Sequence, residues 1–363
     1  MKVVLFVHSL VSDWNHGNAH FLRGIVRELA RRGHEPAVYE PADGWSRRNL
    51  VRQHAAALDE FAAAFPGLRS RTYNRRLDVD EALDGADVAV VHEWNEPWLV
   101  RRIGRTSVPA LFHDTHHRAV TAPAEMRRYD LSGYAGVLAF GRAVAEVYRK
   151  RGWHDRVWVW HEAADVSLFR PLRRAKRGDL IWIGNWGDGE RSTELRRFLL
   201  GPASRLGLNG TVHGVRYPAR SVTAVARSGL TYGGWLPNHR APEAFARHRV
   251  TVHVPRRPYV EALPGIPTIR PFEALACGIP LVSAPWEDAE GLFSPGQDYL
   301  VARNGRELER HVGDVLRDRE LATELSRRGR RTILERHTCA HRVDQLLSIF
   351  RELGVPAREA RAA

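Results

Sequence analysis

The sequence contains few cysteines and no apolar run long enough to cross a membrane. Cys277 and Cys339 are the only cysteines among 363 residues, which excludes a disulfide framework and most cysteine-based metal sites. No segment approaches the roughly 20 apolar residues of a membrane span. The apolar run from Met1 to His8 is too short for a signal peptide and predicts a buried strand. These absences lead us to expect a cytoplasmic protein.

Lysine is nearly absent as well, although the chain is strongly basic. It occurs only at positions 2, 150 and 176, which leaves 52 of the 55 basic residues as arginine, and the formal net charge is +13. Basic surfaces bind polyanions, but a GC-rich genome explains this arginine excess better, and we expect no nucleic-acid partner. Peripheral contact with an anionic membrane stays open as an alternative, through Arg47, Arg48, Arg75 and Arg76. The sequence does not indicate an oligomeric state.

Short β-branched runs alternate with amphipathic stretches along most of the chain. This alternation is typical of parallel sheets covered by helices, and 363 residues suffice for two domains. The loop after the first predicted strand lacks the Gly-x-Gly-x-x-Gly of a dinucleotide-binding fold, which counts against an NAD enzyme. The predicted strands are 3–7, 37–39, 88–91, 110–112, 137–140, 157–160, 180–183, 211–213, 230–232, 250–254, 281–283 and 299–302; the clearest predicted helices are 19–32, 305–316, 320–336 and 341–353.

Residues 264–283 carry the most informative pattern. An irregular segment ends near Thr268 and a short helix follows, with Glu273 expected in its first turn and Gly278 at its end. The first backbone N–H groups of a helix lack partners and carry the positive end of the dipole, so they can hold a diphosphate. The apolar run 279–282 then predicts a central parallel strand. The pattern therefore favours a nucleotide-sugar site.

This segment resembles the donor-binding motif of GT-B glycosyltransferases, most of all the branch that resembles the spore-maturation protein CgeB. Asp165, Phe169 and Pro171 resemble the segment that enters the second domain of such enzymes. The resemblance implies an α/β fold of GT-B type, with two Rossmann-like doubly wound parallel-sheet domains facing a central cleft and a C-terminal helix that crosses back to the first domain. The implied domains are an N-terminal acceptor-side domain at 1–168, a nucleotide-sugar donor domain at 169–345, and a crossover helix and tail at 346–363.

The resemblance also bears on the donor site. In the larger retaining relatives two glutamates separated by seven residues mark it; Glu273 matches the second, which holds the ribose hydroxyls, and Gly265 stands where the first would contact the sugar. Retaining chemistry is therefore not carried over, and the stereochemistry stays open. Arg270 is either a ligand contact or part of a structural salt bridge. The other expected donor-binding residues are Gly184, Asn185 and the phosphate-binding Arg191 in a strand-to-helix loop, Val215 on the nucleobase side, and the backbone N–H groups of Thr268 and Ile269.

Acceptor activation points to the first domain, where histidines follow predicted strands. Ligands bind at the strand ends of an open α/β sheet, and a histidine can accept a hydroxyl proton near neutral pH. His92 is therefore expected on the acceptor side, and the resemblance implies a direct substrate role for His113. In the loop after the first strand, Asp13 or His16 is a candidate base if the reaction inverts the anomeric carbon, and Gly17 could bring backbone near the donor phosphates. Helix capping by Asn18 would explain much of this loop without catalysis.

No metal site is expected. His113, Asp114, His116 and His117 are close in sequence, but adjacent residues on a loop often diverge and the chain offers no partner cluster. Asp78-Val-Asp80 mimics the Asp-x-Asp metal motif of the other glycosyltransferase fold, but helix capping accounts for it.

Together these observations predict a metal-independent glycosyltransferase of the hexosyltransferase type. It would move a sugar from a nucleoside diphosphate sugar to an unidentified acceptor, which could be a small molecule, a glycan or a lipid-linked compound. The nucleotide sugar is a substrate, and no separate cofactor is expected. Two alternatives stay open: a nucleotide-sugar epimerase of the same architecture, and a catalytically silent relative that binds sugar nucleotides, for which Gly265 is the best support.

Overall fold

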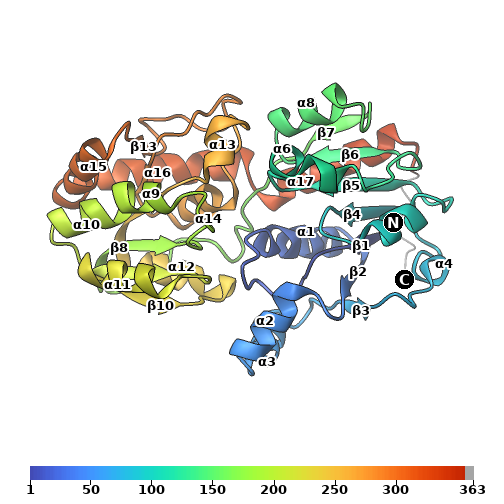
Figure 1. Cartoon of the computed structure of the whole chain (residues 1–363), viewed down its shortest axis with the longest axis horizontal. Coiled ribbons are helices and arrows are strands. Elements are labelled where there is room, and N and C mark those ends of the chain that lie inside the picture. Colours follow the sequence, from blue (N-terminus) through green and yellow to red (C-terminus); the bar gives the residue numbers. More distant parts are fainter. Residues whose placement is uncertain (356–363) are drawn as a thin grey trace. The chain divides into compact units, whose positions relative to one another are not determined.

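The computed structural model describes residues 1–355, which divide into two compact units (Figure 1). The first unit contains residues 1–162 together with the chain from Cys339 onward, and the second contains residues 163–338. The chain thus leaves and re-enters the first unit a few residues before positions 168 and 345, where the sequence analysis drew its boundaries. The end of the expected tail, residues 356–363, lies outside the described residues.

The first unit is built on a seven-stranded sheet in the order β3-β2-β1-β4-β5-β6-β7. Every neighbouring pair is parallel. The strand order reverses direction next to β1, so β2 and β4 flank it on either side. The strands are β1 (Lys2–Phe6), β2 (Glu35–Pro41), β3 (Arg71–Tyr73), β4 (Val88–His92), β5 (Ala110–Asp114), β6 (Gly136–Ala139) and β7 (Val157–Val159).

Helices connect these strands, and the last helix of the chain returns to them. The C-terminal helix α17 packs against α1, where the Arg32 guanidinium donates to the Ala340 carbonyl over 3.0 Å. The Trp160 indole N–H donates to the Arg342 carbonyl over 2.9 Å. The helices are α1 (Ala19–Arg31), α2 (Trp45–Gln53), α3 (Ala57–Ala64), α4 (Val79–Ala82), α5 (Pro97–Ile103), α6 (Arg118–Thr121), α7 (Pro123–Met126), α8 (Arg142–Lys150) and α17 (Cys339–Glu352).

The second unit repeats the plan with six parallel strands in the order β10-β9-β8-β11-β12-β13. Here β8 takes the place of β1, with β9 and β11 beside it. Alternate residues of β8 enter two different hydrophobic clusters, Leu180 and Trp182 in one, Ile181 and Ile183 in the other. Both faces of the strand are therefore buried, as a central parallel strand requires. The strands are β8 (Gly178–Ile183), β9 (Gly210–His213), β10 (Leu230–Gly234), β11 (His248–His253), β12 (Leu281–Ser283) and β13 (Leu300–Val301).

The helices of the second unit are short near the strand ends and long toward the end of the unit. The chain closes α14 at Gly278, whose φ of 67° is the left-handed conformation of a helix C-cap. The helical segments are α9 (Ser192–Leu195), η1 (Arg196–Leu200), α10 (Gly201–Arg205), α11 (Ala219–Arg227), η2 (Asn238–Arg240), α12 (Ala241–Ala246), α13 (Arg257–Glu261), α14 (Ile269–Cys277), α15 (Gly305–Arg317) and α16 (Arg319–Arg336).

The structure confirms the predicted doubly wound α/β fold, and each predicted strand is present with shifts of a few residues at its ends. The edge strand β3 was missed, because the run Arg71-Thr-Tyr73 is short and mostly exposed. Asp78 caps α4 by accepting from the backbone N–H groups of Asp80 and Glu81, as predicted. No helix within residues 1–355 combines the length and the apolarity needed to cross a membrane.

Candidate active site

Ligands of open α/β sheets bind beyond the carboxyl ends of the strands, where the strand order reverses. In the first unit this point lies between β1, which is followed by the loop from Val7, and β4, which ends at His92. In the second unit it lies between β8 and β11, which lead to Gly184 and to Val254. Several of the predicted site residues follow these strands.

Arg191 lies at the switch point of the second unit and has no carboxylate partner within the described part of the chain. Its guanidinium donates to the Asn185 carbonyl over 2.6 and 3.2 Å and to the Val254 carbonyl over 3.1 Å, and it stacks over the Trp182 ring at 5.2 Å. Gly187 has a φ of 90°, and a Cβ there would come within 2.8 Å of the Arg191 side chain. Burial, with a smaller contribution from neighbouring arginines, lowers the pKa of Arg191 to about 9.

Two further arginines add positive charge around Arg191. Arg256 donates to the Glu190 carboxylate over 2.7 Å, and Arg270 pairs with Glu273. Both arginines lower the pKa of Arg191 by charge repulsion. Three guanidinium groups therefore share two carboxylates, and the surplus positive charge suits a bound anion such as a diphosphate.

The pair between Arg270 and Glu273 settles one alternative and corrects one expectation. Arg270 does make a salt bridge, and Glu273 is fully buried beneath it. Glu273 does not belong to the first turn of α14, which contains no acidic residue. The helix begins at Ile269, so Glu273 lies more than one turn into it, and its buried carboxylate is positioned by Arg270 rather than by the free N–H groups of the helix start.

The start of α14 is strained. Thr268, its N-cap, has φ 59° and ψ 179° and makes no side-chain capping bond. This conformation belongs almost only to glycine and costs on the order of 1–3 kcal/mol in other residues. It is followed directly by Ile269, whose backbone N–H is one of the unpartnered donors of a helix start. Such strain persists where a local backbone shape is required, which is typical of ligand-binding segments.

His253 is a site residue that the sequence analysis missed, because it falls at the end of an otherwise apolar strand. Its Nδ1 lies 3.0 Å from the Ser283 hydroxyl, which itself donates to the Ala284 carbonyl over 2.8 Å. Nδ1 must therefore be the donor, and Nε2 is an acceptor that is buried without a partner. Burial, Arg191 and Arg270 lower the pKa of His253 to about 3, so the ring is neutral.

The loops after β8 and β9 are joined to each other, as the predicted nucleotide site requires. The Val215 N–H donates to Asn185 Oδ1 over 3.0 Å, and the Tyr217 hydroxyl donates to the Gly184 carbonyl over 2.8 Å. Gly214 approaches so closely that a Cβ there would lie 2.1 Å from the Gly184 oxygen. Gly184, Asn185 and Val215 therefore form one rigid surface at this edge of the sheet.

Gly265 has a carboxylate beside it, supplied by another loop. A Cβ built on Gly265 would lie 2.8 Å from Cγ and 3.4 Å from Oε1 of Glu290, and the Gly265 N–H donates to the Glu287 carbonyl over 3.0 Å. Glu290 is far from Gly265 in sequence, and no pattern in the chain connects them. The side chain of Glu290 thus occupies the space toward which a residue at position 265 would point.

Four buried histidines follow one another at the switch point of the first unit. The ring centroids are 4.9 Å apart for His8 and His16, 6.3 Å for His16 and His92, and 5.4 Å for His92 and His113. Each has a ring nitrogen without a hydrogen bond, Nδ1 in His92 and Nε2 in the other three. The structure therefore brings the predicted His16, His92 and His113 together and adds His8, which ends the apolar run of β1.

Burial keeps these four rings neutral. It lowers the pKa of His8 to about 4 and that of His113 to about 3, and it lowers the pKa of His16 and His92 well below the ordinary value. A neutral imidazole offers one donor and one acceptor, so the array can hydrogen-bond hydroxyl groups. The free nitrogens are thus suited to an uncharged, hydroxyl-bearing ligand.

The loop after β1 holds the other predicted residues of this unit. Asp13 is paired with Arg23 over 2.9 Å, both side chains being buried, which gives its carboxylate a structural partner. Gly17 is exposed. Asn18 precedes α1, but its side chain makes no capping bond, and its Nδ2 donates instead to Glu162 over 2.7 Å. The expectation that Asn18 caps the helix through its side chain is therefore wrong.

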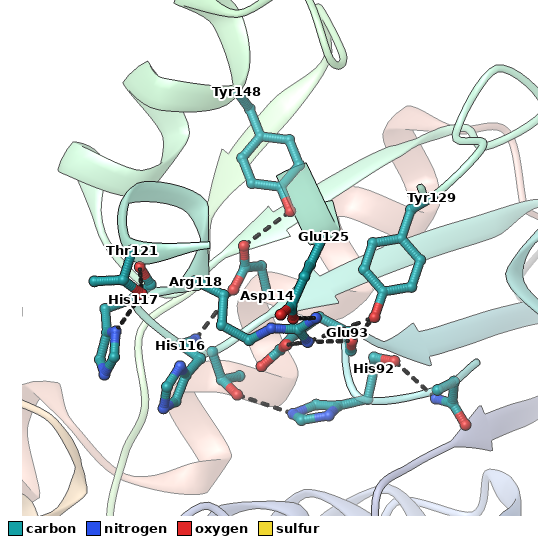
Figure 2. Close-up of polar contacts among 12 residues, drawn as sticks. His92, Glu93, Asp114, His116, His117, Arg118, Thr121, Glu125, Tyr129 and Tyr148 are labelled. Carbon is teal, nitrogen blue, oxygen red and sulfur yellow. Dashed lines mark hydrogen bonds and ion pairs between the residues drawn. The ribbon is translucent and has the colours of Figure 1, made fainter. Parts of the chain in front are cut away.

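A buried acidic network lies behind the histidines, and only its residue types were visible in the sequence (Figure 2). Glu93, which follows β4, pairs with Arg118 over 2.9 Å. Asp114, at the end of β5, accepts from the Tyr148 hydroxyl over 2.8 Å and from the His116 N–H over 3.0 Å. Burial raises the pKa of Asp114 to about 6 and that of Glu93 well above its ordinary range. The Arg118 guanidinium thus pairs with one buried acid, Glu93, and with the exposed Glu125.

Two histidines of this region contact threonine hydroxyl groups. His117 Nδ1 lies 2.9 Å from the Thr121 hydroxyl, and His92 Nε2 lies 2.9 Å from the Thr115 hydroxyl (Figure 2). Across residues 1–355 no group of three or more His, Cys, Asp and Glu side chains is arranged to hold a metal ion.

The fold defined by these two sheets is that of the GT-B glycosyltransferases. The structure of Anabaena HepE in complex with UDP-glucose matches with a TM-score of 0.70 at 14% identity, over 97% of this chain and 100% of that one. Sucrose-phosphate synthase from Thermosynechococcus elongatus matches with a TM-score of 0.66 at 14% identity, over 98% and 99%. The T4 phage BGT structure in complex with UDP and Mn2+ matches with a TM-score of 0.63 at 12% identity, over 97% and 99%. At these identities the likeness establishes the fold.

Sequence comparison gives a match over part of the chain. Residues 191–348 match the family described as glycosyl transferase-like. This span begins at Arg191 and includes α14 with Glu273. No curated protein matches the chain in sequence.

Proposed function

We propose that this protein is a glycosyltransferase whose second unit binds the diphosphate of a nucleoside diphosphate sugar. The observation that carries the proposal is Arg191, a buried guanidinium held by two backbone carbonyls with no carboxylate partner among the described residues. Burying an unpaired charge is costly, and a diphosphate beside Arg191 would compensate it. The glycosyl transferase-like match of residues 191–348 and the UDP-glucose bound to HepE support the same ligand class.

The proposed donor site assigns a task to each neighbouring group. The start of α14 at Thr268 and Ile269 would donate backbone N–H groups to phosphate oxygens, and Arg270 would hold Glu273 in place for the ribose hydroxyls. Gly184, Asn185 and Val215 would form the surface on the nucleobase side. His253 Nε2 would accept a hydrogen bond from a hydroxyl or amide group of the ligand.

Glu290 would supply the carboxylate that position 265 lacks. Its side chain lies where a residue at 265 would point, so it would contact the sugar rather than the nucleotide. Glu290→Gln should therefore leave UDP binding unchanged and remove a few-fold of the affinity gained by UDP-glucose over UDP. Equal losses for both ligands would contradict this role.

In the first unit, His113, His92 and His16 would contact hydroxyl groups of the substrates, and one of them would accept the acceptor proton. Asp13 is a weaker candidate for the base than His16, because Arg23 already pairs with its carboxylate. We also propose that donor charge is neutralised by arginines without a metal, although T4 BGT is seen with Mn2+. Activity that persists in EDTA would support this, and a strict requirement for Mn2+ would refute it. We further propose that the protein belongs to the CgeB-like branch and acts in the cytoplasm.

A thermal-shift panel of UDP-glucose, GDP-mannose and dTDP-glucose tests the proposal directly. We expect one of them to raise the melting temperature and to be hydrolysed slowly without acceptor, whereas an epimerase would convert the sugar and a silent subunit would only bind it. Stabilisation should disappear in Arg191→Met and persist in Arg174→Ala, whose arginine is half-exposed and pairs with Glu243. Failure of every nucleotide sugar to stabilise the wild-type protein would sink the transferase proposal.

A further inference from the structure

The first switch point contains a feature that the proposed function does not use: His8 lies between two indole rings. Its ring centroid is 5.2 Å from that of Trp45 and 5.8 Å from that of Trp94. His8 is 4% exposed, and its Nε2 has no hydrogen-bond partner. Both tryptophans are only partly buried, so each indole offers some of its surface next to a buried, unsatisfied nitrogen.

Each indole is held from behind. Trp45 begins α2 and packs edge-on against Trp14 at 5.7 Å, whose own N–H donates to Gln53 over 2.8 Å. Trp94 lies beneath the Arg118 guanidinium, 4.6 Å from the ring centroid. Arg118 is in turn fixed by Glu93, so the buried acidic network of Figure 2 positions the Trp94 ring. The two rings are therefore preorganised, which lowers the entropic cost of binding.

Three arginines of this region are already paired with carboxylates, whereas Arg48 on α2 is exposed. Arg23 pairs with Asp13 over 2.9 Å. Arg47, on the same helix as Trp45, pairs with Glu40 over 2.6 Å, and Arg118 pairs with Glu93 over 2.9 Å. None of these three arginines offers a free charge, and the histidines are neutral. A phosphate-bearing ligand would find no counterpart to the surplus cation that Arg191 provides in the second unit.

We propose that Trp45, His8 and Trp94 form an acceptor subsite for a neutral carbohydrate ring. The apolar C–H faces of the sugar would pack on the indoles, which bury large area at little entropic cost. His8 Nε2, with His16 beside it, would hydrogen-bond one hydroxyl. The assignment of this subsite to the acceptor rests on the proposed function. Binding at the subsite itself requires only a neutral ring with hydroxyl groups.

The test measures binding of neutral sugars to the full-length protein by ligand-observed saturation-transfer NMR, with maltose, cellobiose and methyl glucoside as probes. We expect saturable binding of at least one of them. Trp94→Ala and Trp45→Ala should each weaken that binding about tenfold, and Trp94→Phe should weaken it less because it keeps an aromatic face. Trp98→Ala is the matched control, since Trp98 bonds to Glu96 on α5 and lies outside the array.

Three outcomes would overturn the subsite. They are tighter binding of glucose 6-phosphate than of methyl glucoside, neutral-sugar binding that is unaffected by both alanine substitutions in folded protein, and no saturable binding of any neutral probe up to its solubility limit. UDP-glucose titration of the same preparations separates this inference from the proposed function. If the wild-type protein does not bind UDP-glucose, the proposed transferase function is refuted. Sugar binding that depends on Trp45 and Trp94 would still establish the subsite.

Discussion

The two units share one topology but differ in the charge that they place at the switch point. In the second unit, Arg191 carries a buried positive charge without a carboxylate partner within residues 1–355, and Arg256 and Arg270 increase it. In the first unit, Arg23 and Arg118 are each neutralised by a buried carboxylate, and the histidines are uncharged. The same strand order can thus present an anion site or a neutral site. The difference resides in the few residues that follow the strands.

The largest expected effect concerns Arg191, because it creates the contrast. Arg191→Met keeps much of the side-chain volume but removes the charge and its hydrogen bonds. Charged hydrogen bonds contribute about 1.5–3 kcal/mol, so the affinity for UDP should fall roughly 100-fold. Isothermal titration calorimetry at constant ionic strength measures it. If UDP binds Arg191→Met as tightly as wild type, the second switch point is not an anion site and the comparison fails.

Glu273 sharpens the contrast by testing which part of the nucleotide the second unit binds. Glu273→Gln keeps the shape of the side chain but weakens its bond to a ribose hydroxyl, so UDP affinity should fall by about 1–2 kcal/mol. The same titration with 2′-deoxy-UDP and 3′-deoxy-UDP checks the cause. We expect the substitution to cost little with the deoxynucleotide that lacks the contacted hydroxyl. An equal loss with all three ligands would show that Glu273 acts only through Arg270.

The neutrality of the first unit predicts how its stability depends on pH. The folded pKa of His113 is about 3 and that of His8 about 4, both below the unfolded value of 6.5. Between the folded and the unfolded pKa, the unfolded chain binds more protons than the folded chain does. Stability therefore falls as pH decreases from 6.5 toward 4. Asp114, with a folded pKa of about 6 against 3.8, opposes this trend below pH 6. The raised pKa of Glu93 opposes it as well, but more histidines than acids contribute.

His113→Gln isolates one of these protons. Between pH 4 and 6.5, His113 should contribute about 1.4 kcal/mol per pH unit to the slope of the unfolding free energy against pH. The variant should lose this contribution. Urea unfolding at pH 5, 6 and 7, followed by circular dichroism, measures this slope in the variant and in the wild type. An unchanged slope would mean that His113 is protonated in the folded protein, and the first switch point would then not be neutral.

The sequence was sufficient for the fold because alternating β-branched runs and amphipathic helices are local patterns. It also located the helix and strand of the proposed donor segment, α14 and β12, since a helix start and a following strand can be recognised from neighbouring residues. The contacts that distinguish the two switch points are not local. Glu290 lies beside Gly265, and Arg118 pairs with Glu93 and covers the Trp94 ring; both contacts join residues from separate segments.

Two local predictions failed because each side chain has a partner other than the helix end, a distant one for Asn18 and one in the same helix for Glu273. Asn18 bonds to Glu162, more than a hundred residues away, instead of capping α1. Glu273 is paired with Arg270 inside α14 instead of complementing the free N–H groups of its first turn. In both cases burial of the side chain makes a long-range or paired contact more favourable than a solvent-exposed cap.

The smallest expected effect concerns the backbone strain at Thr268. In the loop that follows β1, Asn15 has a φ of 49° and is the comparable residue of the first unit. Thr268→Gly should stabilise the protein by about 1 kcal/mol, because glycine adopts φ 59° without steric cost. Thr268→Ala keeps the Cβ and should gain nothing, so the pair separates strain from loss of the hydroxyl. Urea unfolding measures the stability, and UDP titration measures binding.

If the strained shape serves to present the Ile269 N–H to phosphate, glycine will preserve that shape and UDP affinity will change little. Equal stability of the glycine and alanine variants would contradict the strain, and a large loss of UDP affinity in both would assign the phosphate contact to the threonine hydroxyl instead of the backbone.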